Sequence, residues 1–317
     1  MRQLNRRDFL RRAALGLGGS AAGWLLSACG LSVPSALPTP LAPTPKPDLP
    51  YLVVARGAAE PEELVKRALA ALGGIERFVK PGNDVIIKPN ISVGYYGYQY
   101  AATTNPWVVA TLVRLCKGAG ARRVRVMDFP FGGLAEEAYT RTDIKGQTLA
   151  AGGEMEVMSS MKFTKLELPK GRDLRSCTVY GDIMKADVVI DVPIAKQHSL
   201  AQLSCGMKNL MGIMIERQSM HFNIGQRTAD LASGIPLKLT VVDAIRILRE
   251  NGPTGGNLND VQKIDTIIAS ADVVAADSYA ATLLGLRPQD VSYIKAATAM
   301  GLGRSDLAGM KIEEIRI

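Results

Sequence analysis

The sequence predicts an α/β fold, in which a mainly parallel sheet carries helices on both faces. Short runs rich in valine and isoleucine alternate along the chain with segments whose apolar residues recur at helical spacing. Most of these runs are continuously apolar, which is typical of strands that are buried on both faces. Strands of this kind, separated by helices, favour parallel pairing, and no internal repeat is evident.

The first half of the predicted domain supplies three strands and two helices. YLVVARG (51–57) predicts a strand, and PEELVKRALAAL (61–72) predicts an amphipathic helix. DVIIKPN (84–90) predicts a strand that ends in a turn. NPWVVATLVRLCKGAG (105–120) predicts a helix closed by glycine, and RVRVMD (123–128) predicts the next strand.

The second half supplies three more strands and two more helices. ADVVIDVP (186–193), LKLTVVDA (237–244) and DTIIAS (265–270) are rich in β-branched residues and predict strands. DVVAADSYAATLLG (272–285) and PQDVSYIKAATAMG (288–301) predict helices.

The first 29 residues predict an export signal and no part of the fold. Arg6 and Arg7, followed by Asp-Phe-Leu, resemble the twin-arginine signal of bacteria, and a short apolar run rich in Gly and Ala comes next. The Leu-Ser-Ala-Cys segment that ends at Cys29 resembles a lipobox, whose cysteine receives lipid and becomes the mature N-terminus. The alternative is a plain N-terminal anchor with a chance cysteine. We expect the twin-arginine translocase and the lipoprotein-processing machinery as partners, and a membrane anchor on the extracytoplasmic face of the cell envelope.

Residues 30–50 predict a linker, and residues 51–317 predict the α/β domain. The linker is rich in proline, which favours an extended chain of about 3.1 Å per residue, so it could hold the domain roughly 60 Å from the bilayer. The remainder is long enough to bury a sizeable core.

The formal charge of +8 overstates how basic the folded domain is. The first 29 residues contain five arginines and one aspartate, so the remainder carries only about +4. No basic run is interleaved with aromatic residues, and we expect no nucleic-acid partner. Cys116, Cys177 and Cys205 lack the CxxC spacing of ferredoxin-type clusters, and their pattern indicates neither a disulfide framework nor a role for any of them.

Polar side chains stand at the predicted carboxyl ends of four strands. They are Lys88 with Asn90, Asp128, Lys196 with His198, and Asp243. Ligands of open parallel sheets gather beyond such ends. Each residue alone suits a cap or a turn, but charged groups at four strand ends favour a site, because unpaired charges there cost free energy.

The segment CGMKNLMGIM (205–214) surrounds Lys208 with small and apolar residues. Partial desolvation would lower the pKa of this amine and favour a nucleophile. The alternative is a lysine whose stem lies along an apolar helix face and whose amine reaches water. His198 is available as a neutral ligand or a general base near pH 7, or as a structural histidine bonded to a loop carbonyl. Asn209 fits either account.

Three further segments border on this set. His221 lies in the polar stretch ERQSMHFNIGQR, which predicts a mobile loop able to line the site. YYGYQY (95–100) predicts either a tyrosine lid over a ligand or a cover for the sheet edge. GPTGG (252–256) predicts a plain turn or a cradle of backbone amides for an anion, and it lacks the GKS/T of a P-loop.

Several ordered motifs resemble those of the bacterial domain-of-unknown-function family 362, over almost all of residues 78–302. They include GNDVIIKPN, KADVVIDVPIAKQH, MKNLMG, VVDAI and NGPTGG, and the KN-x-x-G element is the most specific of them. Some relatives carry an iron–sulfur ferredoxin module, for which this sequence has no counterpart.

A more distant similarity is to the N-terminal part of the nickel-pincer lactate racemase family. It rests on the order of a Thr-x-Pro element, ADVVI, a histidine and a glycine-preceded lysine. The resemblance implies that His198 lies beside nickel and substrate, and that Lys208 holds the pincer cofactor covalently. Two segments depart from the racemase pattern: TNP (104–106) lacks its arginine, and the glycine-rich run before the lysine is shortened to CGM (205–207).

We therefore predict an exported, membrane-tethered protein of uncharacterised function, and specifically an isomerase- or oxidoreductase-like enzyme with a cofactor or metal at the strand ends. The site combines Lys88, Asn90, His198, Lys208, Asn209 and Asp243. His198 would act as base or metal ligand, Lys208 as cofactor anchor or electrophilic amine, and Asp243 as a further catalytic group. Because two lysines belong to the set, the substrate would be a small anion. The alternatives are a non-catalytic ligand-binding or scaffolding lipoprotein, and an iron–sulfur-associated redox protein.

Overall fold

The computed structural model describes residues 49–317. The predicted signal peptide with Arg6 and Arg7, the lipidation site Cys29 and almost all of the linker 30–50 lie outside the described residues, so these remain predictions. None of the helices in the described part of the chain is both long and apolar enough to cross a membrane.

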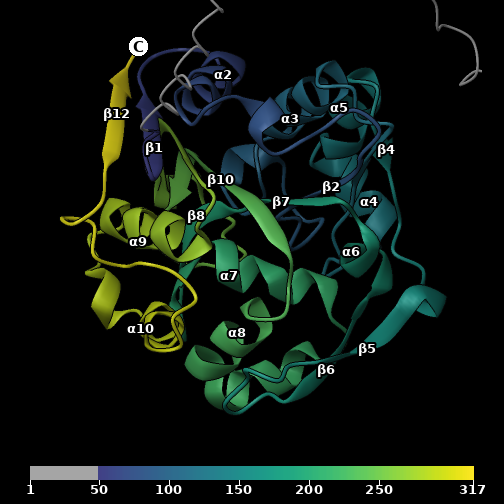
Figure 1. The fold of residues 1–317 in the computed structure, drawn as a ribbon, viewed down its shortest axis with the longest axis vertical. Coiled ribbons are helices and arrows are strands. Elements are labelled where there is room, and N and C mark those ends of the chain that lie inside the picture. The colour runs from purple at the N-terminus through teal and green to yellow at the C-terminus, as the bar shows by residue number, and fades with distance from the viewer. Residues whose placement is uncertain (1–48) are drawn as a thin grey trace, which may run out of the picture. The chain divides into compact units, whose positions relative to one another are not determined.

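The described region is built around a mixed, mainly parallel sheet of ten strands (Figure 1). These strands are β1 (Leu52–Arg56), β2 (Asp84–Pro89), β3 (Arg123–Val126), β4 (Glu154–Met155), β7 (Val188–Val192), β8 (Ile194–His198), β9 (Gln202–Ser204), β10 (Leu237–Leu248), β11 (Val261–Ser270) and β12 (Ile312–Arg316). Along the main path they follow the order β12-β1-β11-β10-β7-β2-β3-β4, and β8 pairs with β10 and β9. Only β11 on this path runs against its neighbours, β1 and β10. The predicted α/β fold with a mainly parallel sheet is confirmed.

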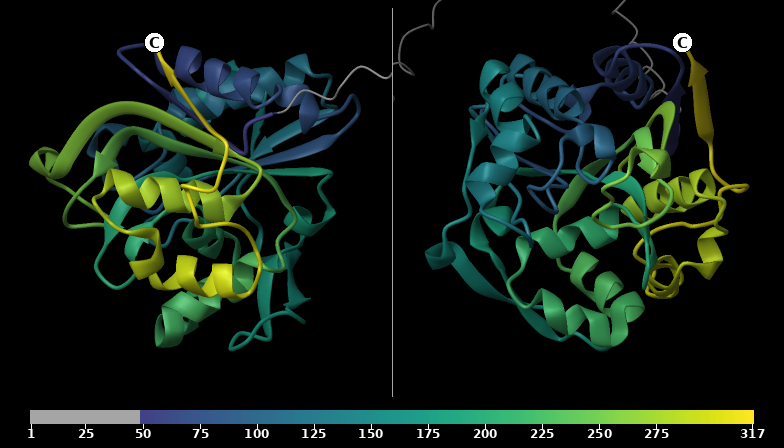
Figure 2. Two further views of the ribbon diagram at one scale, coloured as in Figure 1. Left: turned by 60° about the vertical axis from the view of Figure 1, so that its left-hand side comes forward. Right: turned by 180° about the vertical axis from the view of Figure 1, so that it is seen from behind.

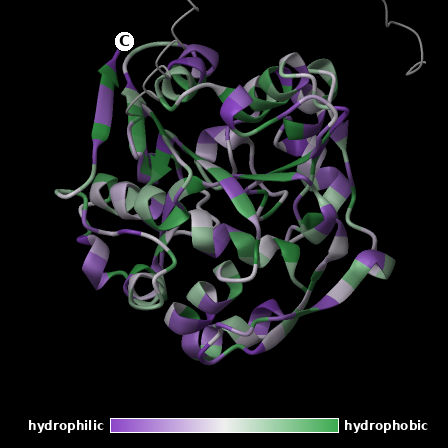
Figure 3. Ribbon diagram, viewed as in Figure 1, coloured by the Kyte–Doolittle hydropathy of each residue, from purple (hydrophilic) through white to green (hydrophobic). Residues whose placement is uncertain are grey.

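Helices cover both faces of the sheet, as predicted (Figure 2). One face carries α2 (Pro61–Ala71), α3 (Pro106–Gly118), α4 (Ala135–Arg141) and α5 (Ile144–Ala150). The other face carries α6 (Gly181–Lys185), α7 (Gly206–Asn209), α8 (Ile224–Ala232), α9 (Val273–Leu283) and α10 (Ser292–Ala299). Figure 3 shows the central strands as mainly hydrophobic, which agrees with their burial between the two layers.

Alternation along the central strands decides which side chains face the α7 layer. In β2, Val85 and Ile87 belong to the core under α2 and α3, whereas Ile86 belongs to the core of the opposite face. Side chains of a strand alternate between the two faces, so Lys88 continues the row of Ile86. Asp191 of β7 is the register partner of Lys88, and this pairing sets the two charged residues side by side on the face that α7 covers.

The predicted strands and helices are all present, with boundaries that shift by a few residues. Two strand ends lie elsewhere than expected. His198 ends β8, a separate strand that begins after Pro193, and Asp243 lies in the middle of β10 because the apolar run continues to Leu248. The sequence pattern did not indicate the small hairpin of β5 (Phe163–Glu167) and β6 (Ser176–Tyr180), in which β5 has only exposed and half-buried residues.

Candidate functional site

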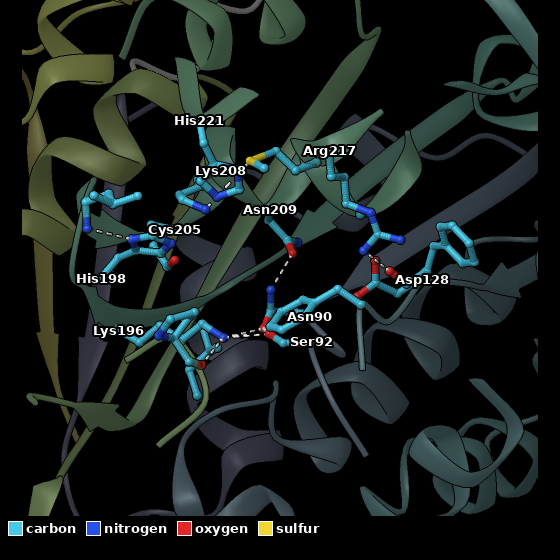
Figure 4. A pocket seen from close by; sticks show the side chains of 18 of the residues that line it. Asn90, Ser92, Asp128, Lys196, His198, Cys205, Lys208, Asn209, Arg217 and His221 are labelled. Carbon is cyan, nitrogen blue, oxygen red and sulfur yellow. Dashed lines mark hydrogen bonds between the residues drawn. The ribbon is translucent and has the colours of Figure 1, made fainter. Parts of the chain in front are cut away.

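A cavity of about 400 Å³ lies beyond the carboxyl ends of β2, β3 and β8 (Figure 4). Its walls come from the loops after β2 and β3, the end of β8, α7 with the following turn η4 (Leu210–Ile213), and η5 (Arg217–Asn223). Four of the predicted site residues line it: Asn90, His198, Lys208 and Asn209. Lys88 lies directly behind the wall. Asp243 does not reach the cavity.

Lys88 is held in a buried ion pair. Its Nζ donates to Asp128 Oδ1 at 2.8 Å, to Asn209 Oδ1 at 3.0 Å and to the Pro89 carbonyl oxygen at 3.1 Å. The other Asp128 oxygen accepts the Ile91 backbone N–H at 2.6 Å. All three protons of the ammonium are engaged, so Lys88 has no donor left for a ligand. Its role is to hold Asp128 and Asn209 in the wall of the cavity.

Asn209 ties α7 to the ends of two strands. Its Oδ1 also accepts from Asn90 Nδ2 at 2.9 Å, while its Nδ2 donates to Asp191 Oδ1 at 2.7 Å. Burial raises the pKa of Asp191 well above its ordinary value, although Lys88 acts in the opposite direction. The second oxygen of Asp191 is buried and has no hydrogen-bond partner among the described residues, which suits a neutral, protonated carboxyl group.

Lys196 is the second lysine near the cavity, and it too is fully engaged. Its Nζ lies within 3.0 Å of four acceptors: Asn90 Oδ1, Ser92 Oγ and the carbonyl oxygens of Ala102 and Pro253. Burial, with help from the charge of Lys208, lowers the pKa of Lys196 to about 7. This lysine therefore fastens the segments around it and leaves the ligand space to other groups.

The short helix α7 begins against a carboxylate from α9. Asp277 accepts the backbone N–H of Gly206 at 2.6 Å and that of Met207 at 2.9 Å. A β-carbon on Gly206 would lie 2.8 Å from Asp277 Oδ1 and 3.2 Å from Asp191 Oδ2, so only glycine allows this approach. Burial raises the pKa of Asp277 to about 7. The first turn of α7, which presents Lys208, is thus held by hydrogen bonds to Asp277 and by close packing of Gly206 against Asp277 and Asp191.

Lys208 is the least engaged cation of the site. Its Nζ has one polar contact, the Met211 sulfur at 3.6 Å, and it forms no ion pair with any described carboxylate. Desolvation lowers the pKa of Lys208 to about 8. This lowering makes a larger fraction of the amine neutral than in an exposed lysine at the same pH, and in Figure 4 Lys208 lies on the same side of the cavity as His198.

His198 is oriented by the chain that follows it. Its Nδ1 accepts the backbone N–H groups of Leu200 at 3.1 Å and Ala201 at 3.2 Å. Burial and the nearby Lys208 lower the pKa of His198 to about 3, so the ring is neutral and carries its proton on Nε2. This arrangement suits a hydrogen-bond donor. It does not suit the general base or metal ligand that the sequence suggested, because both roles need a bare Nε2.

Sequence reasoning missed Arg217 as a site residue. Its guanidinium donates to the Phe129 carbonyl oxygen at 2.6 Å and stacks on the Phe129 ring, 4.4 Å from the ring centroid. Burial lowers its pKa, with the Asp128 charge acting in the opposite direction. His221, from the same turn, also lines the cavity. The signal that could have found Arg217 is its position four residues before His221.

Asp243 has a structural role. Alternation places it on the face of Val241 and Ile245, which is the α3 side of the sheet. Its two oxygens accept the backbone N–H of Asn105 at 2.7 Å and of Ile245 at 3.0 Å, so it fixes the start of α3. Burial raises the pKa of Asp243 to about 6. Its assignment as a catalytic group is therefore corrected.

The tyrosine segment does not line the cavity, whereas the glycine segment reaches it through Pro253. Tyr96 and Tyr100 stack at 4.7 Å, and Tyr98 packs edge-on against Trp107 and under the Arg246 guanidinium, so these rings pack on one another, on α3 and on β10. The GPTGG segment is a turn. Its Pro253 carbonyl oxygen accepts from Lys196.

The described residues contain no group of three or more His, Cys, Asp or Glu placed to hold a metal ion. Cys116, Cys177 and Cys205 lie in three separate hydrophobic clusters. Burial raises the pKa of Cys116 to about 12 and that of Cys177 to about 11, so both are thiols. The site therefore fits a nickel-pincer group only in part: Lys208 offers an amine for it, but His198 offers no free ring nitrogen for the metal.

Comparisons with known proteins find relatives for most of the chain. The thylakoid-associated protein sll1697 of Synechocystis sp. is 27% identical, in a match covering 75% of this chain and 74% of the relative. Among solved structures, the lactate racemase apoprotein of Thermoanaerobacterium thermosaccharolyticum matches at 14% identity and a TM-score of 0.40, covering 78% of this chain and 56% of the racemase chain. A Thermotoga maritima protein solved by a structural genomics consortium matches at 13% identity and a TM-score of 0.44, covering 71% of this chain and 59% of the other.

The family prediction is confirmed by a family model described as a domain of unknown function, DUF362. This model matches residues 85–282, a stretch that runs from β2 to α9 and includes the cavity residues. Because the match spans more than half of the sequence, this chain belongs to the DUF362 family.

Proposed function

We propose that this chain is an exported, membrane-tethered enzyme that binds a small anionic substrate and uses the Lys208 amine as its reactive group. One observation carries the proposal: this amine lines the cavity, and its single polar contact in the described part of the chain is the Met211 thioether. The other lysines nearby spend their protons on the protein. A desolvated lysine without a carboxylate partner is the usual form of a nucleophilic amine.

The charges around the cavity favour an anion. Lys208 and Arg217 both line it, and neither forms an ion pair within residues 49–317. Among the described residues, Asp128 is the only carboxylate that lines it, and the charge of Asp128 is balanced by Lys88. An anionic ligand would therefore supply the counter-charge that the protein withholds.

The apolar part of the lining favours a substrate with a hydrocarbon portion. Phe131 and Leu200 line the cavity and are 57% and 62% exposed, and Met211 lies deeper. Apolar walls with a few placed polar groups are typical of sites for small organic ligands. We therefore take a carboxylate with an aromatic or branched body as the test ligand.

The rival function is a non-catalytic binding protein, which one observation favours. Asp128 accepts from both Lys88 and the Ile91 N–H, so within residues 49–317 the cavity wall has no carboxylate that is free to act as a base. The iron–sulfur alternative finds no support in the described cysteines, because they lie in separate clusters.

The membrane-tethered part of the proposal rests on the sequence before the domain. The Arg6-Arg7 pair and the segment ending at Cys29 support export and lipidation. The relative from Synechocystis is named as thylakoid-associated, and an association with a membrane accords with a tether here.

Titration calorimetry with 3-phenyllactate tests the binding proposal. The wild-type protein should bind it, and Arg217→Gln should weaken binding by about tenfold, because a charge-assisted hydrogen bond is lost. Arg122→Gln, at an exposed position away from the cavity, is the matched control and should bind as the wild type does. Equal binding by both variants, or no binding by the wild type, would contradict an anion site in this cavity.

A further inference from the structure

We infer that Lys208 condenses with the carbonyl group of a 2-oxo acid, so that the substrate is held as an imine on its Nζ. This inference rests on the proposed function and names the substrate class of the same cavity. It concerns a bond that the protein's own side chains can form and break.

The Lys208 amine lines the cavity, and no hydrogen-bond acceptor oxygen of the described residues engages it. Lys208 Nζ contacts Met211 Sδ at 3.6 Å and has no oxygen acceptor among the described residues. Lys88 and Lys196, in contrast, each have three or more acceptors within 3.1 Å. Desolvation lowers the pKa of Lys196 to about 7 and that of Lys208 to about 8, so both amines lose a proton more readily than an exposed lysine. Four acceptors enclose Lys196 Nζ, whereas Lys208 has none within residues 49–317 that holds its lone pair away from a ligand.

A donor for the carbonyl oxygen lies on the same side of the cavity. His198 Nδ1 is occupied by two backbone N–H groups, so its proton is on Nε2. Nε2 has no hydrogen-bond partner among residues 49–317. A neutral imidazole N–H can polarise a carbonyl group without competing for the proton of the amine. Figure 4 shows His198 and Lys208 on one wall.

A partner for the carboxylate lies across the cavity. Arg217 donates through Nη1 to the Phe129 carbonyl oxygen and through Nη2, at 3.5 Å, to that of Pro130. A guanidinium has five N–H groups, so three remain for a ligand. The cavity therefore presents an amine and an imidazole N–H on one side and a guanidinium on the other, which matches an oxo group adjacent to a carboxylate.

The step balances without a further reactant. The neutral amine attacks the carbonyl carbon, and a C–N bond forms while the C=O π bond breaks. The carbinolamine then loses its oxygen as water together with the two amine protons, and the C=N bond forms. Hydrolysis reverses the step and returns the oxo acid, so no oxidant or reductant is consumed.

Reductive trapping of the full-length protein tests the inference. The protein is treated with 3-phenylpyruvate and cyanoborohydride and then mapped by peptide mass spectrometry. We expect one reduced adduct on Lys208 at a reagent level that leaves exposed lysines largely unmodified. Excess 3-phenyllactate, which has the same charge but a hydroxyl in place of the 2-oxo group, should suppress the adduct by occupying the cavity.

Two variants and one comparison make the result decisive. Lys208→Met should lose the adduct and bind 3-phenyllactate more weakly than the wild type, because it removes a cation that lines the cavity. Lys117→Met, which removes an exposed lysine at the end of α3, should keep the adduct. Binding of both acids without an adduct on Lys208, or adducts spread over exposed lysines, would overturn the imine and leave the anion site standing. Failure of both acids to bind would overturn the proposed function as well.

Discussion

Gly212 lies directly against Asp128. A β-carbon on this glycine would come within 2.1 Å of Asp128 Oδ1 and 2.7 Å of Lys88 Nζ. The ion pair between Asp128 and Lys88 is almost fully buried, and its partners cannot retreat into solvent. The glycine that closes the motif CGMKNLMG is therefore a steric requirement of the wall behind Lys208.

Gly212→Ala should separate the Lys88–Asp128 pair and lower the free energy of unfolding by about 3–5 kcal/mol, the usual cost of breaking a buried pair. Urea unfolding followed by circular dichroism measures it. Gly118→Ala is the matched control, because a β-carbon at that helical position meets nothing within 4 Å, and it should change stability by less than about 1 kcal/mol. Similar losses in both variants would show that the contact at residue 212 does not matter.

Lys208→Met should leave the free energy of unfolding unchanged or raise it by up to about 3 kcal/mol, because a desolvated amine is removed. The melting temperature should therefore stay the same or rise. The folded pKa of about 8 lies below the ordinary value of 10.5, so the unfolded chain binds the proton more tightly. The gain is therefore largest below pH 8 and should fade as the pH approaches 10.5. Lys88→Met, which orphans Asp128, should instead destabilise. A marked loss of stability in Lys208→Met would mean that its amine has a structural partner.

The reactivity of Lys208 should follow its lowered pKa. Modification by trinitrobenzenesulfonate, an anion that attacks neutral amines, should rise with pH and level off just above pH 8 at Lys208. Exposed lysines should keep accelerating toward pH 10. Peptide mapping of samples quenched at each pH gives both profiles, and a Lys208 profile identical to that of the surface lysines would contradict a desolvated amine.

Cys29→Ala should release the folded domain from membranes, because acylation at this position is the predicted anchor. Fractionation of cells that express the variant, followed by immunoblotting, measures the release, and the melting temperature should not change. If the variant stays in the membrane fraction after high-salt and carbonate washing, the lipoprotein prediction is wrong.

The predicted twin-arginine signal should direct export of the domain after it has folded in the cytoplasm. Arg6→Lys with Arg7→Lys should trap a folded precursor in the cytoplasm, and a general-secretory signal, which exports unfolded chains, should deliver protein without any group inserted before export. Intact mass and absorbance of the two products measure the difference. If the protein exported by the general-secretory signal contains as much bound group and is as active as the native protein, insertion of that group in the cytoplasm does not explain the twin-arginine signal.

Much of the fold could be predicted because its strands are continuous apolar runs. Lys208 could also be singled out, since a charge between Met207 and Met211 is visible in the sequence alone. Asp243 misled because it looks like a strand end until the pairing of β10 shows that the strand continues. Its side chain then falls on the α3 side of the sheet, and no local pattern reveals this.

The rest depends on contacts between distant residues. Asp277 sits in an apolar helix and meets Gly206 only through the fold, and Arg217 becomes a site residue only when η5 packs beside Phe129. The donor role of His198 follows from two backbone N–H groups whose direction is a property of the turn after β8. Sequence spacing contains none of this geometry.

The contacts that place α7 determine at which stage of folding the pKa of Lys208 is lowered. Lys88 and Asn209 are 121 positions apart in the chain, and Gly206 and Asp277 are 71 apart. Pairings over such distances form late in folding, since loop closure must come first. On the ribosome, before α9 has emerged, Lys208 is an ordinary solvated lysine with an ordinary affinity for protons. Its chemistry arises only once the domain is complete.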